Sequence, residues 1–170
     1  MILLDTCVLI DLKAYLLSPS ELYVASMLSR AELAFGVVEA PTTALRQKRR
    51  TRLANLDEWL DWLPFDRAAS DGYGTVGGAS GLSGARSRSK DALIAGQAYA
   101  LGAAVMTANL ADFAPFEQYI TVVAPTPRAA AQPRRRGAFA PAVTMKILLV
   151  FLSFLCYNIL RKYFGGALRE

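Results

Sequence analysis

The chain has 170 residues, a length that suits one globular domain with an appendage and is too short for two large domains. It contains no histidine, which excludes Ser-His-Asp and Cys-His hydrolases, His-ligated zinc sites and histidine phosphotransfer. Its two cysteines, Cys7 and Cys156, are too few for a disulfide framework or a cysteine metal cage, so we expect a reducing compartment, the cytoplasm. With 54% hydrophobic residues, a packed core is possible and global disorder is excluded.

The formal net charge of +5 is distributed unevenly along the chain. Residues 1–132 carry 12 Lys and Arg against 13 Asp and Glu, a net charge of −1, whereas residues 133–170 carry seven against one, a net charge of +6. The basic character therefore belongs to the tail, and the net charge is no evidence that the main domain binds a polyanion.

Residues 1–125 alternate between short apolar runs and segments of helical period, a pattern typical of βα units around a parallel sheet. We expect strands over 2–4, 22–27, 62–65, 103–107 and 121–123. Helices are expected over 8–17, 29–38, 42–60, 67–76 and 92–101. The apolar spacing in 42–60 leaves an outer face of basic residues, for which we favour a solvated surface over an RNA-binding one: Arg46, Lys48, Arg49, Arg50 and Arg52. The glycine-rich segment 77–90, which has a basic end, predicts a mobile loop or a frayed helix.

The composition changes after residue 125. Residues 126–144 are rich in Pro, Ala and Arg and predict a linker, and 145–170 form an apolar tail predicted to be helical. Its apolar stretch, 147–160, would span only about 21 Å as a helix, less than the ~30 Å hydrocarbon core of a membrane. Three interpretations stay open: a membrane-associated helix, a helix docked on the domain or its dimer partner, and an appendage without an evolved role.

Four carboxylates stand out because they follow predicted strands or begin predicted helices: Asp5, Glu32, Asp91 and Asp112. Each has a purely structural interpretation. Asp5 suits a helix N-cap, Ser29 with Glu32 fits the S-x-x-E capping box, and acids are common in the first turn of a helix.

Taken together, the four acids predict a metal site. Loops that leave the carboxyl ends of parallel strands gather at one edge of the sheet, where ligands bind. Clustered carboxylates repel one another unless a cation neutralises them, and oxygen ligands favour Mg²⁺ or Mn²⁺. Such an ion suits phosphodiester hydrolysis, since it lowers the pKa of bound water and stabilises charge on the phosphate.

Two other acidic α/β architectures fit poorly. A haloacid-dehalogenase-like phosphatase needs a second aspartate two positions after its nucleophile, and Cys7 occupies that position here. A response-regulator receiver needs a lysine after a late strand, and the segment beginning at Thr107 lacks one.

Five segments, in order and spacing, resemble the PIN-domain ribonucleases, specifically the VapC-type toxins of bacterial toxin–antitoxin pairs. They are Ile2-Leu3-Leu4-Asp5-Thr6-Cys7-Val8-Leu9-Ile10-Asp11-Leu12, Ser29-Arg30-Ala31-Glu32-Leu33-Ala34-Phe35-Gly36, Leu63-Pro64-Phe65-Asp66, Asp91-Ala92-Leu93-Ile94-Ala95 and Thr107-Ala108-Asn109-Leu110-Ala111-Asp112-Phe113. The resemblance covers residues 1–125 and implies a three-layer α/β/α domain. It also implies an endoribonuclease dependent on Mg²⁺ or Mn²⁺, a small cognate antitoxin and a homodimer.

The resemblance also assigns roles to residues. It implies that the four acids bind the metal, Asp5 and Asp91 above all, and that neighbouring polar groups orient a carboxylate or the attacking water: Thr6, Thr107 and Asn109. It further implies that three basic residues contact RNA phosphates: Arg86, Arg88 and Lys90.

The chain departs from the family pattern at three places. Cys7 stands where Asn or Ser is common, which predicts the loss of a polar neighbour for Asp5, and the glycines of 77–84 replace a more regular helix. The family pattern does not account for 126–170. Two other functions therefore stay open: an antitoxin-binding module with weak catalysis, and a membrane-associated protein that acts through its tail.

Overall fold

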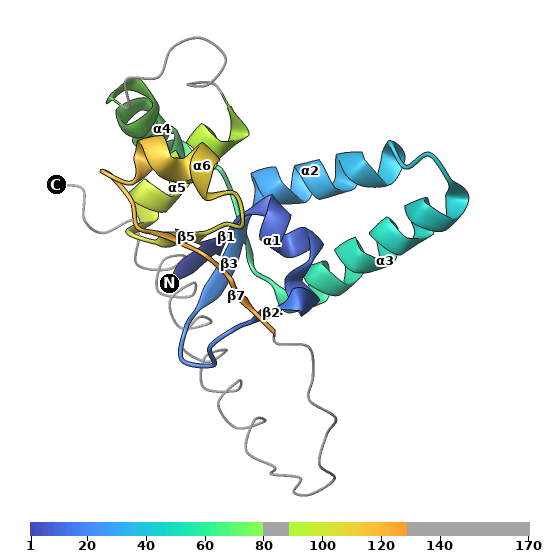
Figure 1. The fold of residues 1–170 in the computed structure, drawn as a ribbon. Helices are drawn as coiled ribbons and strands as arrows, with labels where there is room; N and C mark the ends of the chain where they lie inside the picture. The colour runs from blue at the N-terminus through green and yellow to red at the C-terminus, as the bar shows by residue number, and fades with distance from the viewer. Residues whose placement is uncertain (80–88, 129–170) are drawn as a thin grey trace, which may run out of the picture. The chain divides into compact units, whose positions relative to one another are not determined.

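The computed structural model describes residues 1–79 and 89–128. Its centre is a sheet with the strand order β4-β3-β1-β5-β6, of which Figure 1 labels β3, β1 and β5. The strands are β1 (Ile2–Leu4), β3 (Tyr23–Ser26), β4 (Trp62–Leu63), β5 (Ala104–Met106) and β6 (Val122–Val123). All four pairings are parallel, as the alternating pattern predicts.

Both faces of the sheet are buried, because successive side chains of a strand point to opposite faces. In β1, Leu3 belongs to one core cluster and Leu4 to the other. The same division holds in β5, where Val105 and Met106 lie in different clusters. The continuous apolar runs that predict the strands therefore reflect burial on two sides.

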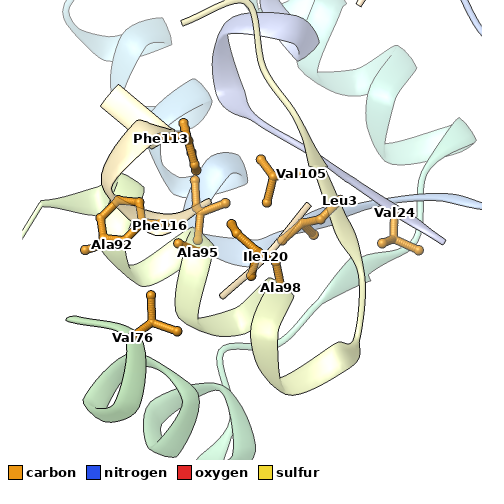
Figure 2. Packing of buried hydrophobic residues seen from close by; sticks show 11 residues of the cluster. Leu3, Val24, Val76, Ala92, Ala95, Ala98, Val105, Phe113, Phe116 and Ile120 are labelled. Carbon is orange, nitrogen blue, oxygen red and sulfur yellow. The ribbon is translucent and has the colours of Figure 1, made fainter. Parts of the chain in front are cut away.

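Helices α4 (Arg67–Ala79), α5 (Lys90–Leu101) and α6 (Leu110–Phe113) cover the first face. Figure 2 shows Val76 of α4, Ala95 of α5 and Phe113 of α6 converging with Leu3 and Val105 of the sheet. The α5 side chains that take part are mostly alanines, so the helix can lie close to the sheet.

Helices α1 (Thr6–Ile10), α2 (Met27–Val38) and α3 (Thr43–Trp59) provide the second core cluster, on the opposite face. Leu33 of α2 and Leu56 of α3 reach this cluster, and α2 and α3 run side by side as an antiparallel pair (Figure 1). The three-layer α/β/α architecture is therefore confirmed.

The helix predicted over 8–17 is wrong in its second half. α1 begins after Asp5 and ends at Ile10, and a 3-10 helix, Leu12–Ala14, follows. The chain then extends as β2 (Tyr15–Leu16), which pairs antiparallel with β7 (Thr126–Pro127). Contacts with a segment more than 100 residues away thus override the local helical period.

The predicted capping box at Ser29 is also wrong. α2 begins one turn earlier, with Ser26 as its N-cap accepting a hydrogen bond from the Leu28 amide at 3.1 Å. Ser29 is instead fully buried inside the helix.

The glycine-rich segment 77–90, predicted as a mobile loop or a frayed helix, is helical at both of its described ends. Gly77 and Gly78 continue α4, which extends to Ala79, and Lys90 is the first residue of α5. Residues 80–88 lie outside the described residues.

β7 lies within the predicted linker, at its beginning. Within residues 1–79 and 89–128, no helix is both long and apolar enough to cross a membrane. The apolar tail over 147–160 lies outside the described residues.

Candidate active site

The elements that carry the four predicted acids end or begin at one edge of the sheet. β3, β1 and β5 are neighbours, and Asp5 directly follows β1. Glu32 lies in α2, which begins where β3 ends, and Asp112 lies in α6, shortly after β5. Because α5 leads back into β5, its first turn, with Asp91, lies at the same carboxyl edge.

Asp5 is the most firmly held of the four. It is only 6% exposed, and its Oδ1 accepts a hydrogen bond from the Thr6 amide at 2.6 Å. Its Oδ2 accepts one from Thr107 Oγ1 at 2.8 Å and one from Cys7 Sγ at 3.0 Å. The structural and functional interpretations of Asp5 are compatible, since it caps α1 while its carboxylate remains part of the acidic cluster.

Cys7 was expected to cost Asp5 a polar neighbour, and that expectation is wrong. Burial raises the pKa of the Cys7 thiol, and so does its hydrogen bond to Asp5. The thiol therefore remains a donor, and its sulfur accepts from the Ala108 amide at 3.3 Å. The role of Cys7 was detectable in the sequence only from its place in the first turn after Asp5.

Glu32 is held by two neighbours of the other acids. Its Oε2 accepts a hydrogen bond from Thr6 Oγ1 at 2.5 Å, and its Oε1 forms an ion pair with the Lys90 ammonium. Thr6 follows Asp5 and Lys90 precedes Asp91, so these contacts join three of the four acidic segments.

Asp112 is held by the segment after β5. The Asn109 side-chain amide donates to the Asp112 carboxylate, and the Asn109 backbone amide donates to Thr107 Oγ1 at 2.9 Å. Thr107 is fully buried and also donates to Asp5, so one threonine connects the two acids that follow β1 and β5.

Asp91 is the electrostatic centre of the cluster. Desolvation raises the pKa of its carboxyl, and the negative charges of the other acids raise it further: Asp5, Asp112 and Glu32. Each of the other three acids therefore lies close enough to Asp91 to repel its negative charge.

The chemistry of this donor set fits a hard divalent cation. The donors are carboxylate oxygens, and the mutual repulsion at Asp91 is what such a cation relieves. The side chains are not gathered for ligation, however: within residues 1–79 and 89–128, no three His, Cys, Asp or Glu groups lie close enough to hold one ion. Binding would require side-chain movement within the cluster, so the metal-ligand assignment stays a prediction.

The three predicted RNA contacts have separate outcomes. Arg86 and Arg88 lie outside the described residues. Lys90 lies at the cluster, where its ammonium pairs with Glu32 while its side chain remains 65% exposed.

Comparison with known proteins identifies relatives by structure. No family model matches the chain, and a search of curated proteins found no match. A chain of the VapBC-5 toxin–antitoxin complex from Mycobacterium tuberculosis superposes with a TM-score of 0.57 and 26% identity, covering 73% of this chain and 96% of that one.

Two further complexes show the same fold. A chain of VapBC-1 from nontypeable Haemophilus influenzae gives a TM-score of 0.56 at 22% identity, covering 73% of this chain and 98% of that one. A chain of VapBC2 from Rickettsia felis, solved with a promoter DNA fragment, gives 0.55 at 20% identity, covering 74% and 99%. These likenesses confirm the resemblance to VapC-type PIN-like toxins predicted from the sequence.

Proposed function

We propose that this protein is the toxin of a type II toxin–antitoxin pair and cleaves RNA as an endoribonuclease that depends on Mg²⁺ or Mn²⁺. The observation that supports the proposal is the gathering of four acids from separate elements at the carboxyl edge of β1 and β5. A fold alone would not support an activity, because one fold hosts many functions.

The residues that would hold the metal are the four acids: Asp5, Glu32, Asp91 and Asp112. When bound, the ion would supply the charge that stabilises the phosphate and lowers the pKa of the attacking water. Asp5 would need little movement, since Thr6, Cys7 and Thr107 already fix both of its oxygens. Asn109 orients Asp112 in the same way.

The test uses the purified full chain and a labelled single-stranded RNA. Cleavage should require Mg²⁺ or Mn²⁺ and stop with EDTA. Asp5→Asn and Asp91→Asn should each lower the rate at least about 100-fold, because each removes a metal-binding charge from the reaction centre. Calorimetric titration with Mn²⁺ should show correspondingly weaker binding by both variants.

Asp71→Asn provides the matched control. Asp71 lies on α4 with a 77% exposed side chain, far in the sequence from the acidic segments, and its loss should leave cleavage unchanged. Equal activity of Asp5→Asn and the wild type would refute the site assignment.

A second candidate is an antitoxin-binding module with weak catalysis. It is favoured by the ion pair between Glu32 and Lys90, which already neutralises the charge of one of the four predicted ligands. This candidate would be established by three results together: the wild-type protein folds, it binds Mn²⁺ no more tightly than Asp5→Asn does, and it leaves RNA intact.

The proposal includes a small antitoxin and a homodimer as partners. One matched chain comes from VapBC-5, which is described as a member of a family of toxin–antitoxin systems, and this supports the antitoxin. Light scattering of the purified chain, alone and with the protein encoded beside it, tests both partners directly.

A further inference from the structure

A groove of about 690 Å³ runs between α2 and α3 and continues to the acidic cluster. Its walls combine apolar side chains with cationic ones. The lining includes Thr6 and Glu32 at the acidic end and Lys90 beside them. Along the two helices it includes Phe35, Arg49 and Arg52.

Two of the five basic residues of α3 face this groove, contrary to the expectation of a wholly solvated basic face. Arg49 and Arg52 are half-buried and line the groove, whereas the other three are exposed: Arg46, Lys48 and Arg50. A single helix therefore carries two sets of cations in different surroundings.

Within residues 1–79 and 89–128, the two groove arginines have no acidic partner. Arg49 donates to the backbone oxygen of Gly36 on α2 at 2.5 Å, which fixes its guanidinium on the groove wall. In the part of the chain that the structure describes, neither Arg49 nor Arg52 pairs with a carboxylate, although Arg30 on the same helix pair does, with Asp57. Two arginines held in a groove without counter-ions favour an anionic ligand.

An exposed aromatic ring lies beside these charges. Phe35 lines the groove, yet its side chain is 67% exposed, and it lies next to Gly36, the residue that fixes Arg49. Flat rings next to arginines are the combination that binds single-stranded nucleic acid, since the ring stacks on a base and the guanidinium contacts the backbone.

We propose that the groove between α2 and α3 binds the part of a single-stranded RNA that flanks the bond at the acidic cluster. Arg49 and Arg52 contact backbone phosphates, and Phe35 stacks on a base. This inference rests on the proposed endoribonuclease function and deepens it, because it assigns the substrate a path along the α2–α3 pair.

An acidic peptide is the other ligand that these cations could attract. The acidic end of the groove, at Glu32, repels an acidic peptide and an RNA backbone alike unless a cation is present, so this repulsion does not distinguish the two ligands. An RNA substrate must bring a phosphate to that cluster in any case, with the cation that the reaction uses. The exposed Phe35 ring favours RNA, because it offers a stacking surface that a run of acidic side chains does not use.

The test measures binding apart from cleavage. The full chain is titrated into a fluorescently labelled single-stranded 12-nucleotide RNA in EDTA, and anisotropy is followed at several salt concentrations. Arg49→Gln/Arg52→Gln should weaken binding about tenfold at 0.1 M salt. It should also reduce the slope of log affinity against log salt by about 1.4, since each phosphate contact on a single strand contributes about 0.7.

The matched control, Arg46→Gln/Arg50→Gln, removes the same charge from the exposed face of α3 and should weaken binding less than about threefold. Equal losses from the two pairs, or an unchanged affinity of the groove pair, would overturn the inference. Arg49 also donates a hydrogen bond to Gly36, so the double variant to glutamine could unfold. Two further variants then replace it: Arg52→Gln alone, and Arg49→Lys/Arg52→Lys, which preserves both charges. The first should lose part of the affinity and the second should retain most of it.

A labelled oligoglutamate peptide tests the competing ligand. If the wild type binds it and the groove pair does not, while RNA affinity is equal in both, the groove is a peptide site and the inference is wrong. The binding test does not depend on catalysis. If RNA binds through the groove but is not cleaved, only the proposed activity is contradicted. If RNA is cleaved at the same rate with and without Arg49 and Arg52, only this inference is contradicted.

Discussion

The two faces of the sheet are covered by helix pairs of different kinds. On one face, α4 and α5 approach so closely that a Cβ on Gly72 would lie 2.3 Å from the backbone oxygen of Gly96. On the other, α2 and α3 are tied by polar contacts, from Arg49 to Gly36 and from Arg30 to Asp57, with a groove along them. The first pair fixes Asp91 at the site, whereas the second leaves room for a ligand beside Glu32.

The closeness of α4 and α5 is the feature whose loss should have the largest effect. A Cβ at position 96 would lie 2.3 Å from Tyr73 Cα and 2.4 Å from its nitrogen, and backbone cannot move aside as a side chain does. Gly96→Ala should therefore cost about 3 kcal/mol or more of unfolding free energy, measured by urea denaturation.

Gly74→Ala is the control for that prediction. Gly74 lies on α4 with open space around its Cβ position, so alanine should stabilise the helix by about 0.5–1 kcal/mol. If both glycines tolerate alanine equally, the two helices do not pack backbone to backbone.

The α2–α3 pair is held by ordinary apolar burial in addition to its polar contacts. Leu56 is 5% exposed in the second core cluster, and Leu56→Ala should cost about 2–5 kcal/mol. Hydrogen exchange should accelerate in α2 and α3 while α4 and α5 stay protected, because a loosely tied pair opens as a local unit.

Trp59→Ala on the same helix removes a larger but 54% exposed side chain and should cost less than Leu56→Ala. Uniform acceleration of exchange over the whole domain in Leu56→Ala would show that the two faces open together.

Asp91 and Asp57, one on each helix pair, should respond to pH in opposite directions. Desolvation and three neighbouring acids raise the pKa of Asp91, so the folded state holds its proton more tightly than the unfolded chain. Stability should fall as pH rises from the ordinary aspartate value of 3.8 through the raised pKa. Asp91→Asn should then raise Tm at pH 7 while abolishing RNA cleavage.

This effect should be smaller than that of Leu56→Ala, since Asp91 is only half-buried. Thermal melts of the wild type and Asp91→Asn between pH 4 and pH 8 provide the measurement. An unchanged or lowered Tm at pH 7 would show that the acidic cluster carries no net repulsion.

Asp57 should show the smallest effect, with the opposite sign. Its hydrogen bonds from Arg30, both 2.8 Å long, lower the pKa of the Asp57 carboxyl. The pair should stabilise the fold above the unfolded pKa and lose this contribution as pH falls through the lowered folded value. Because both side chains are about one-third exposed, Asp57→Asn should cost only about 0.2–1 kcal/mol at pH 7.

A double-mutant cycle of Asp57→Asn with Arg30→Gln isolates the pair from the rest of α2 and α3. A coupling energy indistinguishable from zero at pH 7 would mean that apolar burial alone holds the two helices together.

The sequence predicted the sheet well because its strands are buried on both faces. Ile2–Leu4 and Ala104–Met106 read as short apolar runs, and such runs are typical of parallel strands whatever surrounds them. It failed at Tyr15–Leu16, because that strand depends on pairing with Thr126–Pro127, and no local pattern records a distant partner. It also began α2 one turn late, because Ser26 and Ser29 are equally good caps locally and only the end of β3 distinguishes them.

By itself, the sequence determined the chemical groups available to this protein: it has no histidine, and four acids lie beside predicted strands, which predicts a site with oxygen ligands. Only the tertiary structure decided which charges face one another. In the structure, Lys90 forms an ion pair with Glu32, and the Cys7 thiol donates a hydrogen bond to Asp5. Arg49 and Arg52 line a groove, whereas Arg46 and Arg50 are exposed. The reason is physical: composition and spacing fix which groups exist, but their electrostatic roles depend on distance and burial, which arise only when segments far apart in the chain pack together.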